Sequence, residues 1–169
     1  MSFSLPKTVI MPVAAQILLA ASLGALLFVF VMQFGFGIQP CVLCLWQRVP
    51  YGVTVVAALL ALIWKPYRRQ TAILLALCAV AYLAGMGLAI FHTGVERHWW
   101  LGTAGCTVHP LQGGSPEDLR RALLETVMAR CDEIAWSVFG LTMANLNIAG
   151  SLGLAFFAAA ASAQAAQDS

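Results

Sequence analysis

The sequence predicts an all-α membrane protein: one bundle of four transmembrane helices, with a short interfacial helix in the second external loop. Of its 169 residues, 61% are hydrophobic and only 9% are charged, whereas soluble domains carry about 25% charged residues. Four apolar stretches reach the roughly 20 residues that cross a bilayer. The alternation typical of a membrane barrel is absent. We therefore expect residues 1–169 to form a single membrane domain.

The four predicted spans cover about residues 9–34, 43–64, 71–91 and 136–161. Arg48, near the start of the second span, is the charge that interrupts them. Inside lipid, a backbone must satisfy its own hydrogen bonds, so each span is predicted to be a helix. The links at about 35–42 and 92–135 become loops.

Positive charge predicts the orientation of the bundle. The link "KPYRRQ", residues 65–70, carries three basic residues and no acidic ones, and Lys7 precedes the first span. The positive-inside rule assigns both to the cytoplasm. We therefore expect cytoplasmic termini, a multi-pass protein of a bacterial inner membrane, and two loops in the periplasm. No basic stripe interleaved with aromatic residues indicates nucleic-acid binding.

The longer loop contains the stretch "GSPEDLRRALLETVMARC", which favours a short helix. Ser115 suits an N-cap, Pro116 the first helical position, and the following acidic residues the positive end of the helix dipole. Apolar residues recur at helical spacing, which is typical of a helix lying on the membrane surface. A helix packed on the loop itself is the alternative.

Four of the five cysteines fall in the two external loops, where disulfides persist. Cys41 and Cys44 form a Cys-x-x-Cys pair at the start of the second span, and Arg48 follows Cys44 by one helical turn. A thiolate at Cys44 would interact with both the helix N-terminus and the guanidinium. This pattern indicates a reactive sulfur pair.

The cysteines could also form structural disulfides or bind a metal. A disulfide that closes so small a ring stabilises little as a staple, and the wide separation of Cys106 and Cys131 is not typical of zinc ligands, so no metal is predicted. Cys106 and Cys131 alone could simply stabilise the loop. Four cysteines allow three pairings; we expect 41–44 and 106–131, with 41–131 as an exchange intermediate.

Position alone leaves Arg48 and His92 open. An arginine inside a span is functional by default, but Arg48 lies near the external end and could extend its head group to the interface. His92 could be an interfacial residue or a donor to a polar cofactor. Cys78, which is surrounded by apolar residues, is expected to be an inert core residue.

With these residues in view, the chain resembles the DsbB-type, quinone-dependent disulfide-forming membrane proteins, in the branch with shorter loops. The resemblance rests on "PCVLCLWQRVPY" at residues 40–51, on four helices, and on one cysteine pair in each external loop. It implies that a periplasmic DsbA-like oxidase forms a mixed disulfide with Cys106, and that Cys131 passes the exchange to Cys41. It further implies that Cys44 contacts ubiquinone or menaquinone, with Arg48 and, less strongly, His92 as cofactor-binding residues.

Two other functions remain open from the sequence. A vitamin K epoxide reductase-like enzyme shares the quinone and thiol chemistry, although its Cys-x-x-Cys pair usually comes late in the chain. A non-enzymatic membrane scaffold with two structural disulfides would also explain the cysteines.

Overall fold

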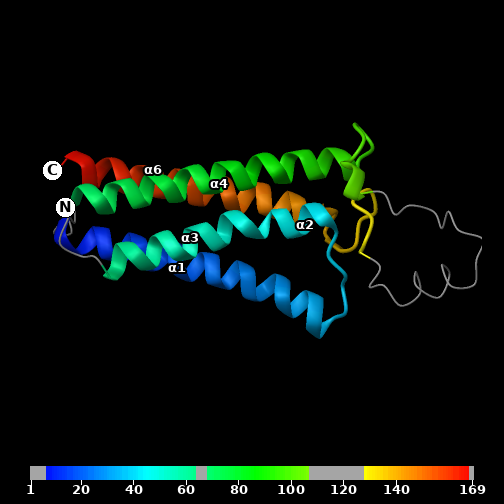
Figure 1. The fold of residues 1–169 in the computed structure, drawn as a ribbon, viewed down its shortest axis with the longest axis horizontal. Coiled ribbons are helices and arrows are strands. Elements are labelled where there is room, and N and C mark those ends of the chain that lie inside the picture. Colours follow the sequence, from blue (N-terminus) through cyan, green and yellow to red (C-terminus); the bar gives the residue numbers. More distant parts are fainter. Residues whose placement is uncertain (1–6, 64–67, 107–127, 168–169) are drawn as a thin grey trace, which may run out of the picture.

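The computed structural model describes residues 7–63, 68–106 and 128–167, which form an elongated helical bundle (Figure 1). Both chain termini lie at one end of it, and α2, the end of α4 and the start of α6 lie at the other, here called the loop end. In chain order the elements are α1 (Lys7–Phe30), a π-helical turn η1 (Val31–Gly35), α2 (Val42–Trp46), α3 (Arg48–Ile63), α4 (Arg68–Glu96), a 3₁₀ turn η2 (Ala104–Cys106), β1 (Ser137–Val138), β2 (Leu141–Thr142) and α6 (Met143–Gln167).

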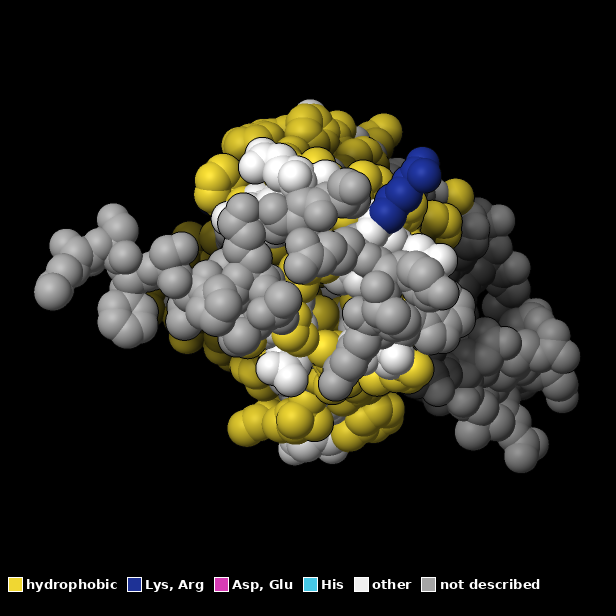
Figure 2. Space-filling model, turned by 90° about the vertical axis from the view of Figure 1, so that its left-hand side faces the viewer, with side chains coloured by type: hydrophobic (Ala, Val, Ile, Leu, Met, Phe, Trp, Pro, Cys, Tyr) yellow, Lys and Arg dark blue, Asp and Glu magenta, His cyan; other side chains and the backbone are white. Residues whose placement is uncertain are grey.

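The predicted fold class is confirmed. Four helical segments are long and apolar enough to cross a membrane: Met11–Gly35, Val42–Ile63, Arg69–Glu96 and Met143–Gln167. Their most apolar windows are only 17–39% buried within the protein, so most of their surface needs an apolar solvent. Figure 2, which faces the end with the termini, shows described flanks dominated by hydrophobic side chains.

Small residues let the helices approach closely in the middle of the bundle. α4 packs along α6 and against α3, which in turn packs on α1. The core cluster is rich in alanine and contains the fully buried Cys78, so the expectation of an inert core cysteine agrees with its surroundings. Helix association in membranes depends on such close packing, because lipid supplies no hydrophobic driving force between helices. Tyr51 and Tyr82 meet edge to face at 5.7 Å in this core.

The second span is broken into α2 and α3 at Gln47, and Pro50 explains the break. Proline lacks an N–H and its ring clashes with the carbonyl of the residue four positions earlier, here Trp46. The helix is therefore interrupted about one turn before the proline. Gly85 of α4 passes over Pro50, and a Cβ at position 85 would lie 3.3 Å from the proline ring carbon Cβ.

The third span extends beyond the predicted end at residue 91. α4 continues to Glu96, where His98 takes a left-handed conformation with φ 58° and ends the helix. Polar bonds to the start of α6 hold this last turn: the Thr142 hydroxyl donates to Glu96 at 2.7 Å, and Asn145 donates to Thr93 at 3.1 Å. The sequence prediction stopped too early because these polar residues look like loop residues when their partners are unknown.

The fourth span begins about seven residues later than the predicted start at residue 136, since α6 starts at Met143. Residues from Ser137 to Thr142 form a two-stranded hairpin, whose turn residues Phe139 and Gly140 both have positive φ values, as type I′ turns require. The helix begins only after Thr142, whose hydroxyl accepts the N–H of Asn145 at 3.3 Å as an N-cap. At its other end α6 continues to Gln167, beyond the predicted end of the span at about residue 161. The predicted interfacial helix at 115–131 falls mostly outside the described residues.

Gly94 gives a test of how the loop end is packed. Trp100 lies against this glycine, and a Cβ there would come within 2.0 Å of the indole ring. The same indole stacks on Phe91 and donates its N–H to the Phe91 carbonyl at 2.9 Å. We expect Gly94→Ala to displace Trp100 and to lower the free energy of unfolding by about 1–3 kcal/mol, as overpacking does. Thermal unfolding in detergent, with tryptophan fluorescence, measures both effects.

Gly87→Ala is the matched control, because a Cβ at Gly87 of the same helix meets no atom within 4 Å. It should leave the fluorescence unchanged. Equal effects of the two substitutions would contradict the packing role assigned to Gly94.

Candidate active site

Cys41 and Cys44 meet at the start of α2. Cys41 is the N-cap of this helix, and its Sγ accepts the backbone N–H of Cys44 at 3.2 Å. The two Sγ atoms lie 2.9 Å apart, and both residues are free thiols in the structure. The Cys-x-x-Cys spacing thus places one sulfur at the helix N-terminus and the second within the first turn, directly beside it.

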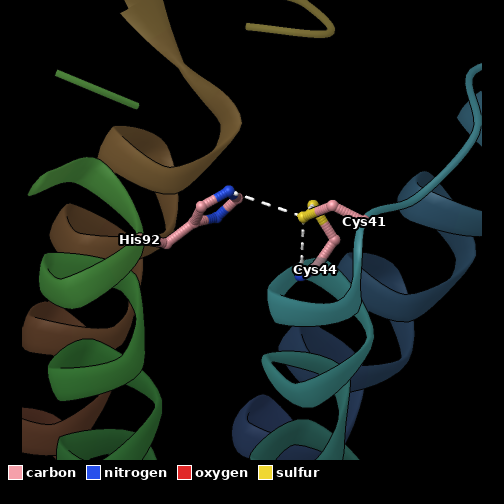
Figure 3. A group of neighbouring side chains, drawn as sticks. All are labelled: Cys41, Cys44 and His92. Carbon is pink, nitrogen blue, oxygen red and sulfur yellow. Dashed lines mark hydrogen bonds between the residues drawn. The ribbon is translucent and has the colours of Figure 1, made fainter. Parts of the chain in front are cut away.

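His92 approaches the same sulfur from α4. Its Nε2 lies 3.5 Å from the Sγ of Cys41, and Figure 3 shows the ring pointing across from α4 to the cysteine pair. His92 is 4% exposed and Cys41 3% exposed, so the contact is shielded from solvent. The carboxylate of Glu96, one turn further along α4, lies 3.8 Å from the same ring nitrogen.

These contacts lower the pKa of the Cys41 thiol well below its ordinary value. The largest contribution is the hydrogen bond with the Cys44 thiol, and His92 adds a hydrogen bond and a favourable charge; burial acts in the opposite direction. The backbone N–H of Cys44 and the His92 ring both face the sulfur of Cys41, so a thiolate at Cys41 has hydrogen-bond donors on two sides. The sequence predicted Cys44 in the first turn of the helix, which is confirmed, but it expected the stabilised thiolate at Cys44, whereas the sulfur at the N-cap is that of Cys41.

A chain of polar side chains, buried except for the half-buried Asn147, lies behind His92. Gln47 Nε2 is 2.8 Å from His92 Nδ1, and the Gln47 carbonyl oxygen accepts a hydrogen bond from the Asn147 amide. The Asn147 oxygen in turn accepts from the hydroxyls of Tyr51 at 2.7 Å and Ser151 at 2.8 Å. Hydrogen bonds therefore connect α6 and α3 to the cysteine pair through His92.

The second cysteine pair lies next to the first. Cys106 and Cys131 form a disulfide with a Cα–Cα distance of 5.0 Å. Both are buried in one apolar cluster with Cys41, Leu43 and Val95. The 3₁₀ turn that carries Cys106 rests on α2, since a Cβ at Gly105 would lie 3.4 Å from the Val42 side chain. The two pairs therefore share one water-poor environment at the loop end.

Arg130 directly precedes Cys131 in the sequence. In the structure its guanidinium binds Asp132 at 2.7 Å and lies 3.5 Å from Glu133. The ion pair lowers the pKa of the Asp132 carboxyl through the hydrogen bond with Arg130. The charge of Arg130 is thus already balanced by acidic neighbours.

A cavity of about 310 Å³ opens beside the Cys41–Cys44 pair. Figure 1 shows α1 diverging from the other helices toward the loop end, and the cavity is walled by residues of α1 and α6 as well as by Cys44, Arg48 and His92. The Arg48 guanidinium donates to Gln33 at 2.8 Å and lies 5.1 Å from the centre of the Phe30 ring. Arg48 is therefore held at the cavity wall by the end of α1 and by η1.

The donor atoms of Cys41, Cys44 and His92 lie within 4.8 Å of one another, the only such group of potential metal ligands among the described residues. Two sulfurs bound tetrahedrally to zinc would be about 3.8 Å apart, given Zn–S bonds of about 2.3 Å. The observed 2.9 Å is shorter. With Gln47 donating to Nδ1, the Nε2 that faces Cys41 carries the proton and offers no lone pair. The arrangement fits thiol chemistry better than metal binding.

The structure brings together the predicted site residues Cys41, Cys44, Arg48 and His92, and sets the Cys106–Cys131 disulfide beside them. Sequence reasoning missed Gln33, Gln47, Glu96 and Asn147. A signal was available for Gln33, Gln47 and Asn147, because polar residues within spanning segments are costly and tend to be functional. Glu96 gave no such signal, because it fell in a predicted loop.

Fold and site together define a multi-pass membrane protein with two neighbouring cysteine pairs, one of them a disulfide, at one end of a four-helix bundle. The family model described as "Disulfide bond formation protein DsbB" matches residues 12–161. Because this match covers most of the chain, the protein belongs to the DsbB family of disulfide bond formation proteins, which points to disulfide-forming oxidoreductase activity.

Curated relatives agree with this assignment. Disulfide bond formation protein B of Xanthomonas axonopodis pv. citri is 31% identical over 153 residues, covering 85% of this chain and 87% of the relative. The protein of the same name from Methylobacillus flagellatus is 26% identical, covering 82% and 84%. An uncharacterised protein of Rickettsia prowazekii is also 26% identical, covering 83% and 81%. No solved structure matches the chain.

The position of the low-pKa sulfur gives a pH prediction. In the reduced protein carrying Cys106→Ser and Cys131→Ser, Cys41 should remain a thiolate at pH values well below about 8.5, the ordinary value for a free cysteine. The thiolate should disappear only when the pH falls through the lowered pKa of Cys41. Ultraviolet absorbance of the thiolate, followed as a function of pH, measures this.

Adding Cys41→Ser should remove the signal at mildly acidic pH, whereas adding Cys44→Ser should leave part of it, because the backbone N–H of residue 44 and His92 still face Cys41. The opposite pattern would show that Cys44 holds the charge.

Proposed function

We propose that this protein reoxidises a DsbA-like thiol oxidase and passes the electrons through its two cysteine pairs to a membrane quinone. The observation that carries the proposal is the shared location of three features: the Cys106–Cys131 disulfide, the Cys41–Cys44 pair, and a largely apolar cavity that reaches Cys44. A soluble partner can be met at the loops and a lipid-soluble acceptor at the cavity.

Four thiol–disulfide exchanges would connect the partner to the cavity. A partner thiolate attacks Cys106 and displaces Cys131 as a thiolate. Cys131 then attacks Cys41 of a Cys41–Cys44 disulfide, and Cys44 leaves as a thiolate. The second partner thiol releases Cys106, which attacks Cys131 and displaces Cys41. The partner gains a disulfide, the Cys106–Cys131 bond is restored, and two electrons with two protons rest on Cys41 and Cys44.

The cavity residues fit a quinone. Its volume of about 310 Å³ is at the small end of ligand pockets, about 300–1,000 Å³, and suits a ring more than a whole isoprenoid molecule. Apolar side chains of α1 and α6 would contact the ring faces, and the Arg48 guanidinium would donate to a carbonyl oxygen. Ubiquinone or menaquinone would supply a two-electron, two-proton acceptor, so that the Cys41–Cys44 disulfide is restored.

We infer the orientation from charge. The basic link at residues 65–70 and Lys7 place the end with the termini in the cytoplasm, so the loop end with its four cysteines would face the periplasm of a bacterial inner membrane. That side is oxidising, which suits disulfide production.

A purely structural role for the two pairs is the second candidate. It would account for the Cys106–Cys131 disulfide, which closes a loop. It leaves unexplained why the pKa of Cys41 is lowered although its thiol is buried, and why Cys44 lines a cavity. Perturbed groups of this kind gather at functional sites.

A coupled assay tests the proposed function. Purified protein in detergent should oxidise a reduced DsbA-like protein with a matching loss of ubiquinone absorbance, at one quinone per partner disulfide. Serine at any one of the four loop-end cysteines should abolish steady turnover, because each takes part in an exchange. Cys78→Ala is the control that should keep turnover, since Cys78 is buried in the bundle core away from the pairs.

Mixed-disulfide trapping completes this test. Cys131→Ser should accumulate the covalent complex with the partner, whereas Cys106→Ser should form none. The relay is wrong if the wild-type protein and Cys78→Ala leave the partner reduced, as the four serine variants should. It is also wrong if turnover continues without Cys44.

The role of Arg48 gives a second kinetic prediction. Arg48→Ala should raise the KM for quinone roughly 10- to 100-fold, the range expected for losing one charged hydrogen bond, and should leave the KM for the partner unchanged. The control is Arg97→Ala, since Arg97 lies over Trp99 and does not line the cavity. An unchanged quinone KM in Arg48→Ala would assign the arginine to the bundle structure alone.

A further inference from the structure

The polar chain behind His92 is directional. Each of its members has a donor on one side and an acceptor on the other: the Tyr51 hydroxyl donates to Asn147, the Asn147 amide to Gln47, and the Gln47 amide to Nδ1 of His92. The remaining ring nitrogen, Nε2, faces Cys41. A neutral imidazole carries its proton on one nitrogen only, so a donor at Nδ1 forces the proton onto Nε2.

The geometry points to Gln47 and Asn147 as positioning residues: they hold His92 in the tautomer whose Nε2–H is aimed at Cys41, and so stabilise the Cys41 thiolate. The reverse direction of the chain would present a bare lone pair to the sulfur. A thiolate can only accept hydrogen bonds, so it requires a proton on Nε2 of His92. The direction of the hydrogen-bond chain requires the same proton position.

Burial makes this selection strong. Gln47 is 8% exposed, and no buried side-chain nitrogen or oxygen atom among the described residues lacks a hydrogen-bond partner. A buried polar group that loses its partner costs about 1–3 kcal/mol. Turning the His92 ring to the other tautomer would therefore require both amides and the hydroxyls behind them to reverse together.

The charged and titratable groups around the pair do not replace this contribution. Cys44 from α2, Arg48 and Tyr51 from α3 and Glu96 from α4 surround it, while α6 supplies the neutral Asn147. Glu96 attracts a proton to Nε2, but at 3.8 Å and with its other oxygen bound to Thr142. The direct donor to Nδ1 is Gln47.

The inference deepens the proposed function and takes its significance from it. In the last exchange of the relay, Cys41 is the leaving sulfur, and a leaving thiol of low pKa departs faster. Gln47 and Asn147 would then influence, through His92, the rate at which Cys41 is released, and the titration described next isolates this effect because both residues also line the cavity.

The test uses the full-length protein with Cys106→Ser and Cys131→Ser, reduced, without quinone or partner. The pH titration of thiolate absorbance gives the apparent pKa of Cys41. Gln47→Leu and Asn147→Leu should each raise the titration midpoint by about one to two pH units, within the range that a lost hydrogen bond to the charged form produces. Gln47→Glu should keep the midpoint close to the original, because a carboxylate binds a doubly protonated His92 that still donates from Nε2.

Glutamate and leucine are similar in size, so a role of Gln47 in packing alone predicts equal effects of the two substitutions. Ser22→Ala controls for the loss of a buried hydroxyl elsewhere in the bundle, since Ser22 bonds to Tyr82 and not to the chain. Folding of each variant is checked by size-exclusion chromatography. If Gln47→Leu is misfolded, Asn147→Leu and Tyr51→Phe supply the comparison, with a smaller upward shift expected from Tyr51→Phe because Ser151 still donates to Asn147.

An unchanged midpoint in folded Gln47→Leu and Asn147→Leu overturns the inference, as do equal shifts in Gln47→Leu and Gln47→Glu. Because the titration needs neither quinone nor partner, its result separates from that of the coupled assay. If the wild-type protein oxidises its partner but the titration midpoints of Gln47→Leu and Asn147→Leu equal that of the wild type, the proposed function stands and the positioning role is wrong.

Discussion

The contact between His92 and Cys41 is the interaction on which the rest of the site depends. A thiolate buried among apolar side chains is unfavourable unless hydrogen-bond donors surround it. Here the donors come from two directions: the first turn of α2 supplies the Cys44 N–H, and α4 supplies the His92 ring. Each donor comes from a helix held by the bundle, so the environment of Cys41 is set before any partner arrives.

The packing of the helices positions these two donors beside Cys41. Pro50 breaks the second span, which lets α2 begin as a separate turn with Cys41 at its N-cap. Gly85 allows α4 to approach the same break closely, and the extra turns of α4 beyond residue 91 carry His92 and Glu96 to the level of the cysteines. Bonds from Thr142 and Asn145 then fix the end of α4 against the start of α6. Backbone irregularities and buried polar pairs, which are costly in lipid, are concentrated at this end.

The sequence predicted those features that depend on composition and length. Four long apolar runs in a chain with 9% charge allow few folds, and the first two spans agree with the structure within about two residues at each end. The errors arose where tertiary contacts decide. α4 runs on through His92 and Thr93 because partners on other helices bury them, and Ser137–Thr142 forms a hairpin because Phe139 and Gly140 adopt positive φ values. The cysteines and Arg48 could be found by spacing, whereas Gln47 and Asn147 are 100 positions apart and are joined only by the fold.

The two cysteine pairs lie in one cluster, but their surroundings differ. Cys106 lies in a 3₁₀ turn and Cys131 in a loop, and among the described residues the Thr103 hydroxyl is the hydrogen-bonding group that approaches a sulfur of this pair, at 3.4 Å from Cys106. Cys41 has three hydrogen-bonding contacts to its sulfur and a polar chain behind one of them. Exchange between disulfides proceeds toward the pair whose released thiolate is better stabilised. In the proposed relay, this difference in donors among the described residues would favour electrons moving from the Cys106–Cys131 pair to the Cys41–Cys44 pair.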